Sequence, residues 1–251
     1  SSSQTFASGS DYFFVTSPPI GNKGAFRFWV LGDSGTANNN ARAVRDAMIN
    51  EIAKQGPDID LWLMLGDNAY SDGTDAEYQA AVFDMYPTFL RNRPLWPTLG
   101  NHDGHTANSS NQTGPYYDIF NLPKNAEAGG VPSFTEAYYS FDYANVHFIC
   151  LNSYDIPGKI GDPMLNWAQQ DANDTNQDWT IAFWHHPPYS RGSHNDNSKM
   201  RDNALKVLEA AGVDIVLSGH SHSFERSFLV HGAYGGSYPD RKSTRLNSSH
   251  Q

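Results

Sequence analysis

Five short polar segments, each directly after a run of apolar, strand-like residues, constrain the fold of this 251-residue chain more than any other feature. In four of them a glycine comes first, and an Asp or a His or an Asn follows it. The segments are Gly32–Gly35, Gly66–Tyr70, Gly100–Asp103, Trp184–His186 and Gly219–His222. In an open α/β sheet the carboxyl ends of the strands line the ligand crevice. Five such loops can therefore converge on one point, and we expect a single site there.

The apolar runs alternate with segments of helical periodicity, a pattern typical of an α/β fold. Strands are expected at Phe26–Leu31, Leu61–Leu65, Trp96–Leu99, Ala137–Phe141, Val146–Leu151, Thr180–Trp184 and Val213–Leu217. Helices are expected at Asn40–Gln55, Ala76–Leu90, Pro163–Asp174 and Arg201–Ala211. Asp142–Asn145 separates two adjacent strands and indicates a hairpin. These elements predict either one mixed sheet or two packed sheets, flanked by helices.

The polar segments carry side chains that bind metal ions. They contribute Asp33, Asp67, Tyr70, Asn101, His185, His220 and His222. Two metal ions about 3.5–4 Å apart need a bridging ligand, and a carboxylate such as Asp67 serves well. Tyr70 follows in the same loop, and a phenol with a pKa of about 10 binds only a strongly acidic ion, usually Fe(III). The asparagine and the histidines suit a softer divalent ion, Zn(II), Mn(II) or Fe(II). The sequence therefore predicts a centre with two metal ions.

The ordered motifs GDxG, GDxxY, GNHD, a histidine after a buried strand, and GHxH resemble those of the calcineurin-like metallophosphoesterases. Tyr70 places the resemblance in the purple acid phosphatase branch, and it covers about residues 20–230. The resemblance implies an α/β fold of four layers, a sandwich of two mixed β-sheets flanked by helices. It also implies how the ligands divide between the ions. Fe(III) would be held by Asp33, Asp67, Tyr70 and His222, and the divalent ion by Asp67, Asn101, His185 and His220.

The same resemblance implies a reaction. Purple acid phosphatases hydrolyse phosphomonoesters with a metal-bound hydroxide as nucleophile, so small-molecule phosphate esters are the expected substrates. His102 and His194 stand where the family has histidines that contact the phosphate without binding a metal, and we expect both to be catalytic. Two other functions stay open here. One is a phosphodiesterase or nucleotide pyrophosphatase on the same metals, and the other is a structural subunit that keeps the fold without activity.

Several residues beside the motifs are expected to play supporting roles. His186 follows a predicted ligand but should point to the other face, where it would pack or support the site. Asp103 could orient a histidine by a hydrogen bond, or it could cap a turn. His105, His147 and His231 lie outside the motifs, and we expect them to be structural.

The charge of the chain excludes some classes of partner. The net charge at pH 7 is −10, with 17 basic and 27 acidic residues. Phosphate backbones need Lys and Arg, so nucleic acid is not an expected partner. An acidic protein can still bind phosphate esters if metal ions reverse the local field. No apolar stretch of the sequence approaches the roughly 20 residues needed to span a bilayer.

The expected compartment is extracellular. Cys150 is the only cysteine, so no internal disulfide can form, and its apolar neighbours predict a buried, inert thiol. Three N-glycosylation sequons begin at Asn108, Asn111 and Asn173. Two of them lie in a polar loop where a glycan can fit. Secretion is therefore favoured, with N-glycans at these three asparagines.

Both ends differ from the predicted catalytic domain, which we assign to residues 20–239. Residues 1–19 contain an aromatic, strand-like run, Asp11–Thr16, followed by prolines. They resemble the last strand and the linker of the fibronectin-like domain that precedes the catalytic domain in this branch. Residues 240–251 resemble a translated sequencing adapter, so we expect them to be non-native and the natural domain to continue beyond Pro239.

Overall fold

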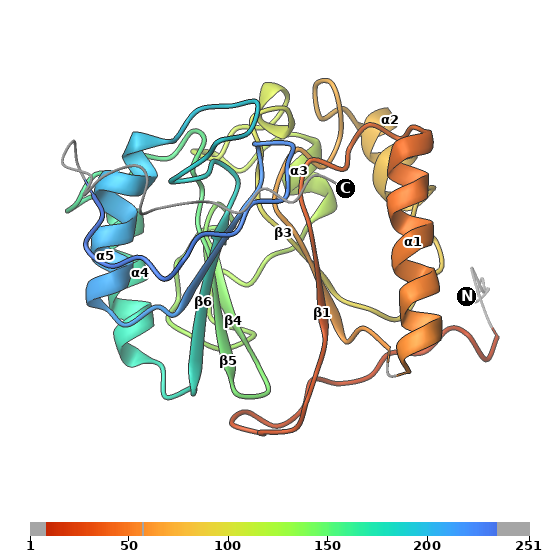
Figure 1. Ribbon diagram of the computed structural model, residues 1–251, viewed down its shortest axis with the longest axis horizontal. Helices are drawn as coiled ribbons and strands as arrows, with labels where there is room; N and C mark the ends of the chain where they lie inside the picture. The colour runs from red at the N-terminus through yellow and green to blue at the C-terminus, as the bar shows by residue number, and fades with distance from the viewer. Residues whose placement is uncertain (1–8, 57, 235–251) are drawn as a thin grey trace, which may run out of the picture.

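Four layers stack in the order helix, sheet, sheet, helix in the computed structural model, which describes residues 9–56 and 58–234 (Figure 1). The strands are β1 (Phe28–Leu31), β2 (Leu61–Met64), β3 (Leu95–Pro97), β4 (Tyr139–Tyr143), β5 (Val146–Cys150), β6 (Trp179–Trp184) and β7 (Ile215–Ser218). The α-helices are α1 (Asn39–Gln55), α2 (Asp75–Tyr78), α3 (Pro115–Ile119), α4 (Pro163–Asp174) and α5 (Leu205–Ala210). Helix α1 covers the outer side of one sheet, and α4 and α5 cover the outer side of the other. The predicted sandwich of two sheets flanked by helices is confirmed.

The two sheets differ in strand direction. Strands β1, β2 and β3 are parallel and follow one another in that order. The second sheet has the order β4-β5-β6-β7 and is mixed, because β4 is antiparallel to β5 while the other neighbours are parallel. Only Ala144 and Asn145 separate β4 from β5, so the predicted hairpin is present. Its turn is two residues shorter than predicted, and β4 therefore lies two residues later than the strand expected at Ala137–Phe141.

Aromatic side chains fill the space between the sheets. Trp96 of β3 stacks on Phe141 of β4 with ring centroids 3.8 Å apart, and Phe28 of β1 meets Phe148 of β5 edge to face at 5.5 Å. Successive residues of a strand point to opposite faces. Phe148 therefore belongs to the core between the sheets, whereas Ile149 packs in the second core with α4 and α5. Strand β2 is buried along its whole length, as expected for a parallel strand covered on both sides.

The strand predicted at Asp11–Thr16 is not formed. All six residues are exposed to solvent, and no strand of the described residues pairs with them. A strand gains stability only when its backbone hydrogen bonds to a neighbouring strand. An aromatic, β-branched composition alone was an insufficient signal for this segment.

Two predicted helices contain a wider turn than expected. The helix predicted at Ala76–Leu90 is α2 followed by a π-helical turn at Gln79–Phe83. The helix predicted at Arg201–Ala211 begins with a π-helical turn at Met200–Ala204 and continues as α5. A π turn holds one more residue than an α turn and changes which side chains face the core. The apolar spacing predicted helical structure at both places but not this change in its hydrogen bonding.

Two predictions drawn from composition can be checked on the described residues. Cys150 is buried, and burial raises the pKa of its thiol to about 12, so the thiol is unreactive as expected. None of the helices described is both long enough and apolar enough to cross a bilayer. Two predictions about the ends of the chain fall partly or wholly outside the described ranges. They concern residues 1–8 of the predicted linker segment and the predicted non-native tail, residues 240–251.

A buried histidine in the second sheet lies between two carboxylates. Nδ1 of His147 is 2.8 Å from Oδ1 of Asp142, and its Nε2 is 2.9 Å from Oδ2 of Asp171. Burial of the ring opposes a positive charge, but the two carboxylates outweigh burial and raise the pKa of His147 to about 9. His147 thereby links β4, β5 and α4, which agrees with the structural role predicted for it.

His147 should make the stability of the fold depend on pH above neutrality. A histidine whose pKa rises to about 9 on folding stabilises the fold fully below about pH 6.5, and this stabilisation is lost as the pH rises through about 9. His147→Gln removes the titrating group. From urea unfolding, we expect the difference in free energy of unfolding between the wild type and His147→Gln to shrink by roughly 2–3 kcal/mol from about pH 6 to about pH 9.5. A difference that is constant with pH would show that His147 is neutral in the folded protein.

Candidate metal centre

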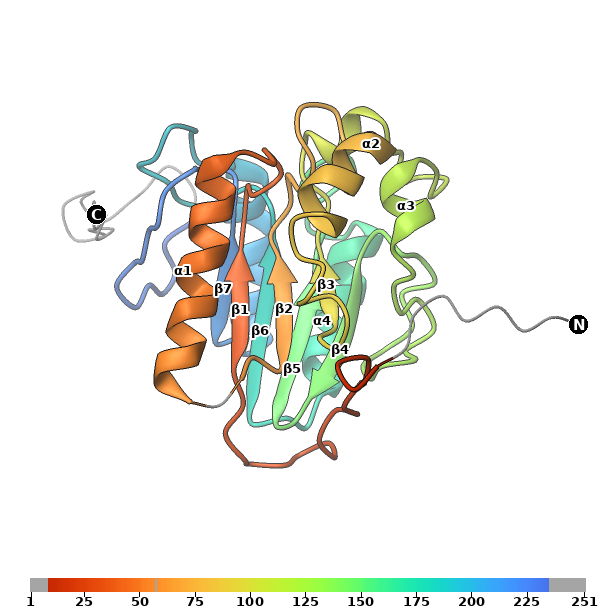
Figure 2. The ribbon, with the colours of Figure 1, turned by 90° about the vertical axis from the view of Figure 1, so that its right-hand side faces the viewer.

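The loops that follow five strands meet at one end of the molecule. The pairing of β1, β2 and β3, and of β6 with β7, is parallel, so neighbouring strands of each set end on the same side (Figure 2). The two sheets lie close together there. A Cβ atom added to Gly32, after β1, would lie only 3.2 Å from Cα of Gly219, after β7. Contacts among their side chains join all the predicted ligands into one cluster: Asp33, Asp67, Tyr70, Asn101, His185, His220 and His222.

Tyr70 faces three other polar atoms of this cluster. Its hydroxyl oxygen lies 3.1 Å from Oδ2 of Asp67, 3.4 Å from Oδ1 of Asp33 and 3.2 Å from Nε2 of His222. A phenol has one proton and can donate it to only one acceptor at a time. Burial raises the pKa of the Tyr70 phenol, and the two carboxylates raise it further. The phenol therefore stays protonated without a cation nearby, and a bound cation would stabilise the crowded oxygens.

His185 is the centre of a second group of contacts. Its Nδ1 lies 2.8 Å from the carbonyl oxygen of Leu65, so Nδ1 donates a proton and Nε2 presents its lone pair. That lone pair faces Oδ1 of Asn101 at 3.0 Å and Nδ1 of His220 at 3.1 Å. It also faces Oδ2 of Asp67 at 3.4 Å, and Asp67 is therefore shared with the group around Tyr70. Burial opposes ionisation of Asp67, but a proton taken up by Nε2 of His185 outweighs burial and lowers the pKa of Asp67 to about 2, and a bound cation would take the place of that proton.

The backbone that carries four of these side chains is in an unfavourable conformation. The φ angles are positive at Asp33 (57°), Asp67 (52°), His220 (67°) and His222 (53°). Residues with a Cβ atom rarely adopt this left-handed region, at a cost of about 1–3 kcal/mol each. Strained residues of this kind concentrate at functional sites, where the surrounding structure holds them in place.

Two motif glycines are required by close contacts between the loops. A Cβ atom on Gly66 would lie 2.6 Å from Nδ1 of His185, and one on Gly100 would lie 2.1 Å from the backbone nitrogen of Asp67. No side chain fits at either position. The glycines that precede Asp67 and Asn101 thus allow the loops after β2 and β3 to pack directly against each other and against His185.

Asp103 links these two loops by hydrogen bonds. It is fully buried, and its carboxylate accepts hydrogen bonds from the backbone N–H of Gly100 at 2.8 Å and of Asn68 at 3.1 Å. The hydroxyl of Tyr78 also donates to it, at 2.6 Å. Burial raises the pKa of Asp103 to about 6 in spite of these donors. Of the two roles left open by the sequence, the structure shows turn capping, since the hydrogen bond from Gly100 closes the turn that ends at Asp103.

The two predicted catalytic histidines lie at the edge of the cluster. The ring of His102 packs on Tyr70 with centroids 4.5 Å apart, and its Nε2 is 4.0 Å from Oδ2 of Asp67. The ring of His194 lies 4.3 Å from the ring of His220. His194 is exposed and His102 is partly exposed, so both can reach a ligand that enters from solvent.

The orientation predicted for His186 is wrong, because its ring does not point to the other face. The ring lies 4.8 Å from His185 and 4.4 Å from His220, and the three histidines could together hold a metal ion. The alternation of faces applies only within a strand, and β6 ends at Trp184. The hydroxyl oxygen of Ser153 lies 2.9 Å from both the backbone nitrogen and Nδ1 of His186, which fixes the ring. Burial and the neighbouring histidines lower the pKa of His186 to about 3, so its imidazole is neutral.

The other two histidines expected to be structural pair with carboxylates. Nδ1 of His105 lies 3.0 Å from Oδ1 of Asp72, and the His105 ring is 5.2 Å from the ring of His102. His231 contacts Glu209 and is far more exposed. The His105 ring thus lies next to the ring of the predicted catalytic His102, while His231 lies on the surface.

Comparison with known sequences agrees with this geometry. Residues 26–224 match the sequence model of the calcineurin-like phosphoesterases, a span that includes all five motifs. Purple acid phosphatase 21 of Arabidopsis thaliana is 30% identical over 224 residues, which are 87% of this chain and 48% of the relative. A purple acid phosphatase of Glycine max is 27% identical over 231 residues, which are 87% of this chain and 47% of the relative. The chain therefore spans about half the length of these curated relatives.

Solved structures share the fold at lower sequence identity. Purple acid phosphatase PPD1 from yellow lupin (Lupinus luteus) matches with a TM-score of 0.65 and 18% identity, over 88% of this chain and 42% of that one. GAP50, described as the anchor in the inner membrane complex of Plasmodium, matches with a TM-score of 0.59 and 21% identity, over 89% of this chain and 76% of that one. From the sequence match over most of its length and from this shared fold, the chain belongs to the calcineurin-like phosphoesterase family, and purple acid phosphatases are among its relatives.

Proposed function

We propose that this chain hydrolyses phosphomonoesters at a centre of two metal ions, Fe(III) and a divalent ion. One observation carries the proposal. The hydroxyl of Tyr70 and Nε2 of His185 each face several polar atoms at 3.0–3.4 Å, with too few protons to satisfy them. A cation at each place would turn these crowded lone pairs into ligands. The donor set of two carboxylates, a phenol, an amide oxygen and three imidazoles fits a hard trivalent ion beside a softer divalent one.

The contacts also support a division of the ligands between the two ions. Tyr70 groups with Asp33 and His222, whereas His185 groups with Asn101 and His220. We therefore assign Fe(III) to Asp33, Asp67, Tyr70 and His222, and the divalent ion (Zn, Mn or Fe) to Asp67, Asn101, His185 and His220. Asp67 would be the ligand shared by both ions, because its carboxylate contacts both groups.

The protein residues around the centre would orient the substrate and supply protons. When bound, the two metal ions lower the pKa of a water molecule and offset charge on the phosphoryl oxygens. His102 and His194 would donate hydrogen bonds to the phosphate oxygens from the solvent side, and His102 would protonate the leaving oxygen. The hydrogen bond from Nδ1 of His185 to Leu65 keeps Nε2 directed into the centre.

The proposal can be tested by comparing two chromogenic esters on the full chain after loading with iron and zinc. We expect 4-nitrophenyl phosphate, a monoester, to have a higher kcat/KM than bis(4-nitrophenyl) phosphate, a diester. A preference for the diester would instead support the phosphodiesterase function. If the metal-loaded protein hydrolysed neither ester, the structural function would be favoured.

Tyr70→Phe should remove any visible colour of the iron-loaded protein. A phenolate bound to Fe(III) gives a charge-transfer band in the visible spectrum, and the substitution removes only the hydroxyl while keeping the ring that packs on His102. We therefore expect the band to disappear and the fold, measured by circular dichroism, to stay unchanged. Tyr154→Phe is a matched control, because Tyr154 lies near the centre, with its ring 6.3 Å from that of His186, without contacting Asp33 or Asp67. The visible band of the iron-loaded Tyr154→Phe protein should persist. A band that survives Tyr70→Phe would show that Tyr70 is not an iron ligand.

Secretion and N-glycosylation stay predictions. The side chains of Asn108, Asn111 and Asn173 are all exposed, so each has room for a glycan. Asn173 lies in the last turn of α4, whereas the other two lie in the loop before α3. These positions are compatible with the glycosylated, extracellular protein that the sequence predicts.

A further inference from the structure

The loop that carries His194 follows β6 and closes on itself. The backbone N–H of Asn197 donates a hydrogen bond to the carbonyl oxygen of Pro187 at 2.8 Å, which joins the two ends of the loop. Within it, the backbone N–H of Ser190 donates to the carboxylate of Asp196 at 2.6 Å. Residues 187–197, called the His194 loop below, therefore form a compact unit with its own internal hydrogen bonds.

The His194 loop packs directly on residues 219–225, the segment after β7 that carries two of the proposed histidine ligands. The ring of His194 lies 4.3 Å and 5.2 Å from the rings of those two histidines. A Cβ atom on Gly192 would lie 2.5 Å from the carbonyl oxygen of Ser221, so no side chain fits there. The backbones of the two segments are thus in contact, and glycine is required at this point.

The carboxylate of Glu225 joins the two segments. Glu225 is half-buried, and it accepts hydrogen bonds from the backbone N–H of Arg191 at 2.9 Å and from the hydroxyl of Ser190 at 3.1 Å. It also accepts one from the hydroxyl of Ser223 at 3.0 Å, within its own segment. Hydrogen bonds to a charged acceptor are stronger than those between neutral groups. Glu225 therefore fixes the distance between the His194 loop and the histidine ligands.

The segment with the histidine ligands is stabilised by the same packing. The φ angles of His220 and His222 are positive, 67° and 53°, and such strain persists only where the surroundings hold the backbone in place. Ser221 lies between them and is buried. Its carbonyl oxygen accepts from the backbone N–H of Ser193 at 3.2 Å and from the Ser193 hydroxyl at 3.1 Å. The outer histidine and the ligands are thus held as one unit.

We propose that Glu225 is a positioning residue, which holds His194 where its ring can reach a phosphate bound at the metal ions. The inference rests on the proposed phosphomonoesterase function and on the role proposed there for His194. Glu225 acts through the backbone of the His194 loop and not by contact with the substrate. Its removal should therefore lower the rate only while His194 is present. A misplacement of about 1 Å can cost roughly a hundredfold in rate.

The test is a double-mutant cycle on the metal-loaded full chain with an alkyl phosphate as substrate. Glu225→Ala should lower kcat/KM roughly ten- to hundredfold in the wild type, but less than about twofold when His194→Ala is already present. Glu225→Gln should keep most of the rate, because its amide oxygen can still accept from Arg191. Gly192→Ala should act like Glu225→Ala, since the added methyl group pushes the two backbones apart. Metal content, measured by elemental analysis, should stay unchanged in Glu225→Ala.

Hydrogen exchange of the backbone amides, followed by mass spectrometry, provides a readout that does not depend on activity. The amides of Arg191 and Ser193 donate across the contact, so Glu225→Ala should speed exchange in peptides from the His194 loop. Glu127→Ala is the matched control. Glu127 is an exposed glutamate that accepts hydrogen bonds from Asn125 in the loop before β4, and its removal should change neither the exchange of the His194 loop nor kcat/KM.

Three outcomes would overturn the positioning role of Glu225. An equal cost of Glu225→Ala with and without His194 would do so and leave the phosphatase function intact. Loss of metal from Glu225→Ala would show that Glu225 supports the ligands instead. If the chain hydrolysed no monoester, the proposed function would fail, and the exchange measurement would decide the inference. Exchange in the His194 loop that Glu225→Ala leaves unchanged would then overturn it.

Discussion

Asp67→Asn is expected to release the metal pair and abolish hydrolysis. The Asp67 carboxylate lies 3.1 Å from the Tyr70 hydroxyl and 3.4 Å from Nε2 of His185, so this predicted ligand contacts both groups of ligands. An amide at this position has no charge to offset the repulsion between two adjacent cations. We expect the metal content, measured by elemental analysis, to fall well below two ions per chain. Turnover should fall by roughly three orders of magnitude or more, since bound metals supply several kcal/mol of stabilisation.

Asp75→Asn is the matched control for this substitution. Asp75 is an exposed aspartate in the first turn of α2, in the segment that follows the Asp67 loop, so the same chemical change is made away from the centre. That variant should keep both metals and full turnover. Two tightly bound ions in a folded Asp67→Asn protein would contradict the assignment of Asp67 as the bridge.

His102→Ala and His194→Ala should keep their metals and lose turnover. Both rings lie beside the cluster, His102 against Tyr70 and His194 against His220, while the seven proposed ligands already give four to each ion. Proton donation and hydrogen bonding by such groups are typically worth roughly 10²–10⁴-fold in rate. We expect losses of that size for alkyl phosphates, whose leaving groups need a proton. The loss should be smaller for 4-nitrophenyl phosphate, whose leaving group does not.

His231→Ala provides the comparison, because His231 is a surface histidine that pairs with Glu209 away from the cluster. It should change neither metal content nor turnover. Loss of metal from His102→Ala or His194→Ala would place that histidine among the ligands. An equal loss of rate on alkyl and aryl phosphates would argue against a role in protonating the leaving group.

The strands, and the clustering of the polar residues that follow them, could be predicted because both leave local signals in the sequence. A strand buried on both faces is a continuous apolar run, so Leu61–Leu65 predicts β2 to within one residue. The parallel arrangement then brings the polar residues after each run to one end. The run at Asp11–Thr16 also has a strand-like composition, but no strand of the described residues pairs with it, and a local pattern does not tell which neighbours a segment will have.

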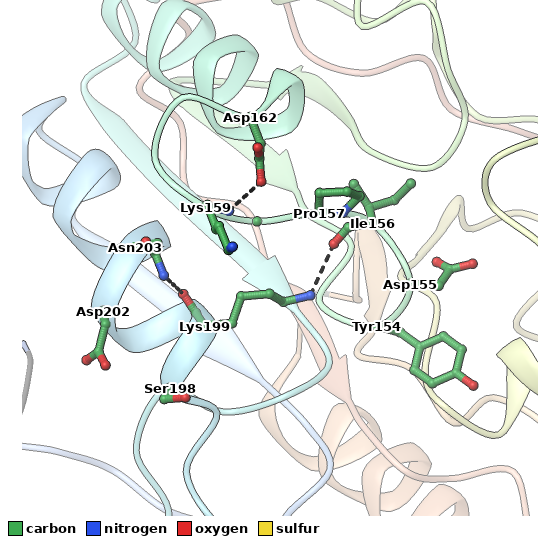
Figure 3. A pocket seen from close by; sticks show the side chains of 11 residues that line it. Tyr154, Asp155, Ile156, Pro157, Lys159, Asp162, Ser198, Lys199, Asp202 and Asn203 are labelled. Atoms are coloured by element: carbon green, nitrogen blue, oxygen red, sulfur yellow. Dashed lines mark hydrogen bonds between the residues drawn. The ribbon is translucent and has the colours of Figure 1, made fainter.

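The sequence could not predict the side chains whose position depends on distant residues. His186 turns toward the cluster because β6 has ended and because Ser153, from the loop after β5, holds its ring. Asp103 joins Gly100 to Asn68, a link between two loops that no spacing in the sequence indicates. A cavity of about 450 Å³ likewise lies between a loop and the start of a helix, and two of its lining residues, Tyr154 and Lys199, are more than forty residues apart in the sequence (Figure 3). Such residues can be identified only when their contact partners are known, and a local sequence pattern does not give these partners.

The most direct test of the proposed centre measures metal binding and activity in the same samples. The full chain would be stripped of metal, Fe(III) and Zn(II) would be added back stepwise, and bound metal and hydrolysis of 4-nitrophenyl phosphate would be followed together. We predict that binding saturates at two ions per chain and that activity appears with the second ion, because Asp67 joins two complete sets of ligands. Saturation at one ion, or full activity in the metal-free protein, would contradict a two-metal phosphatase.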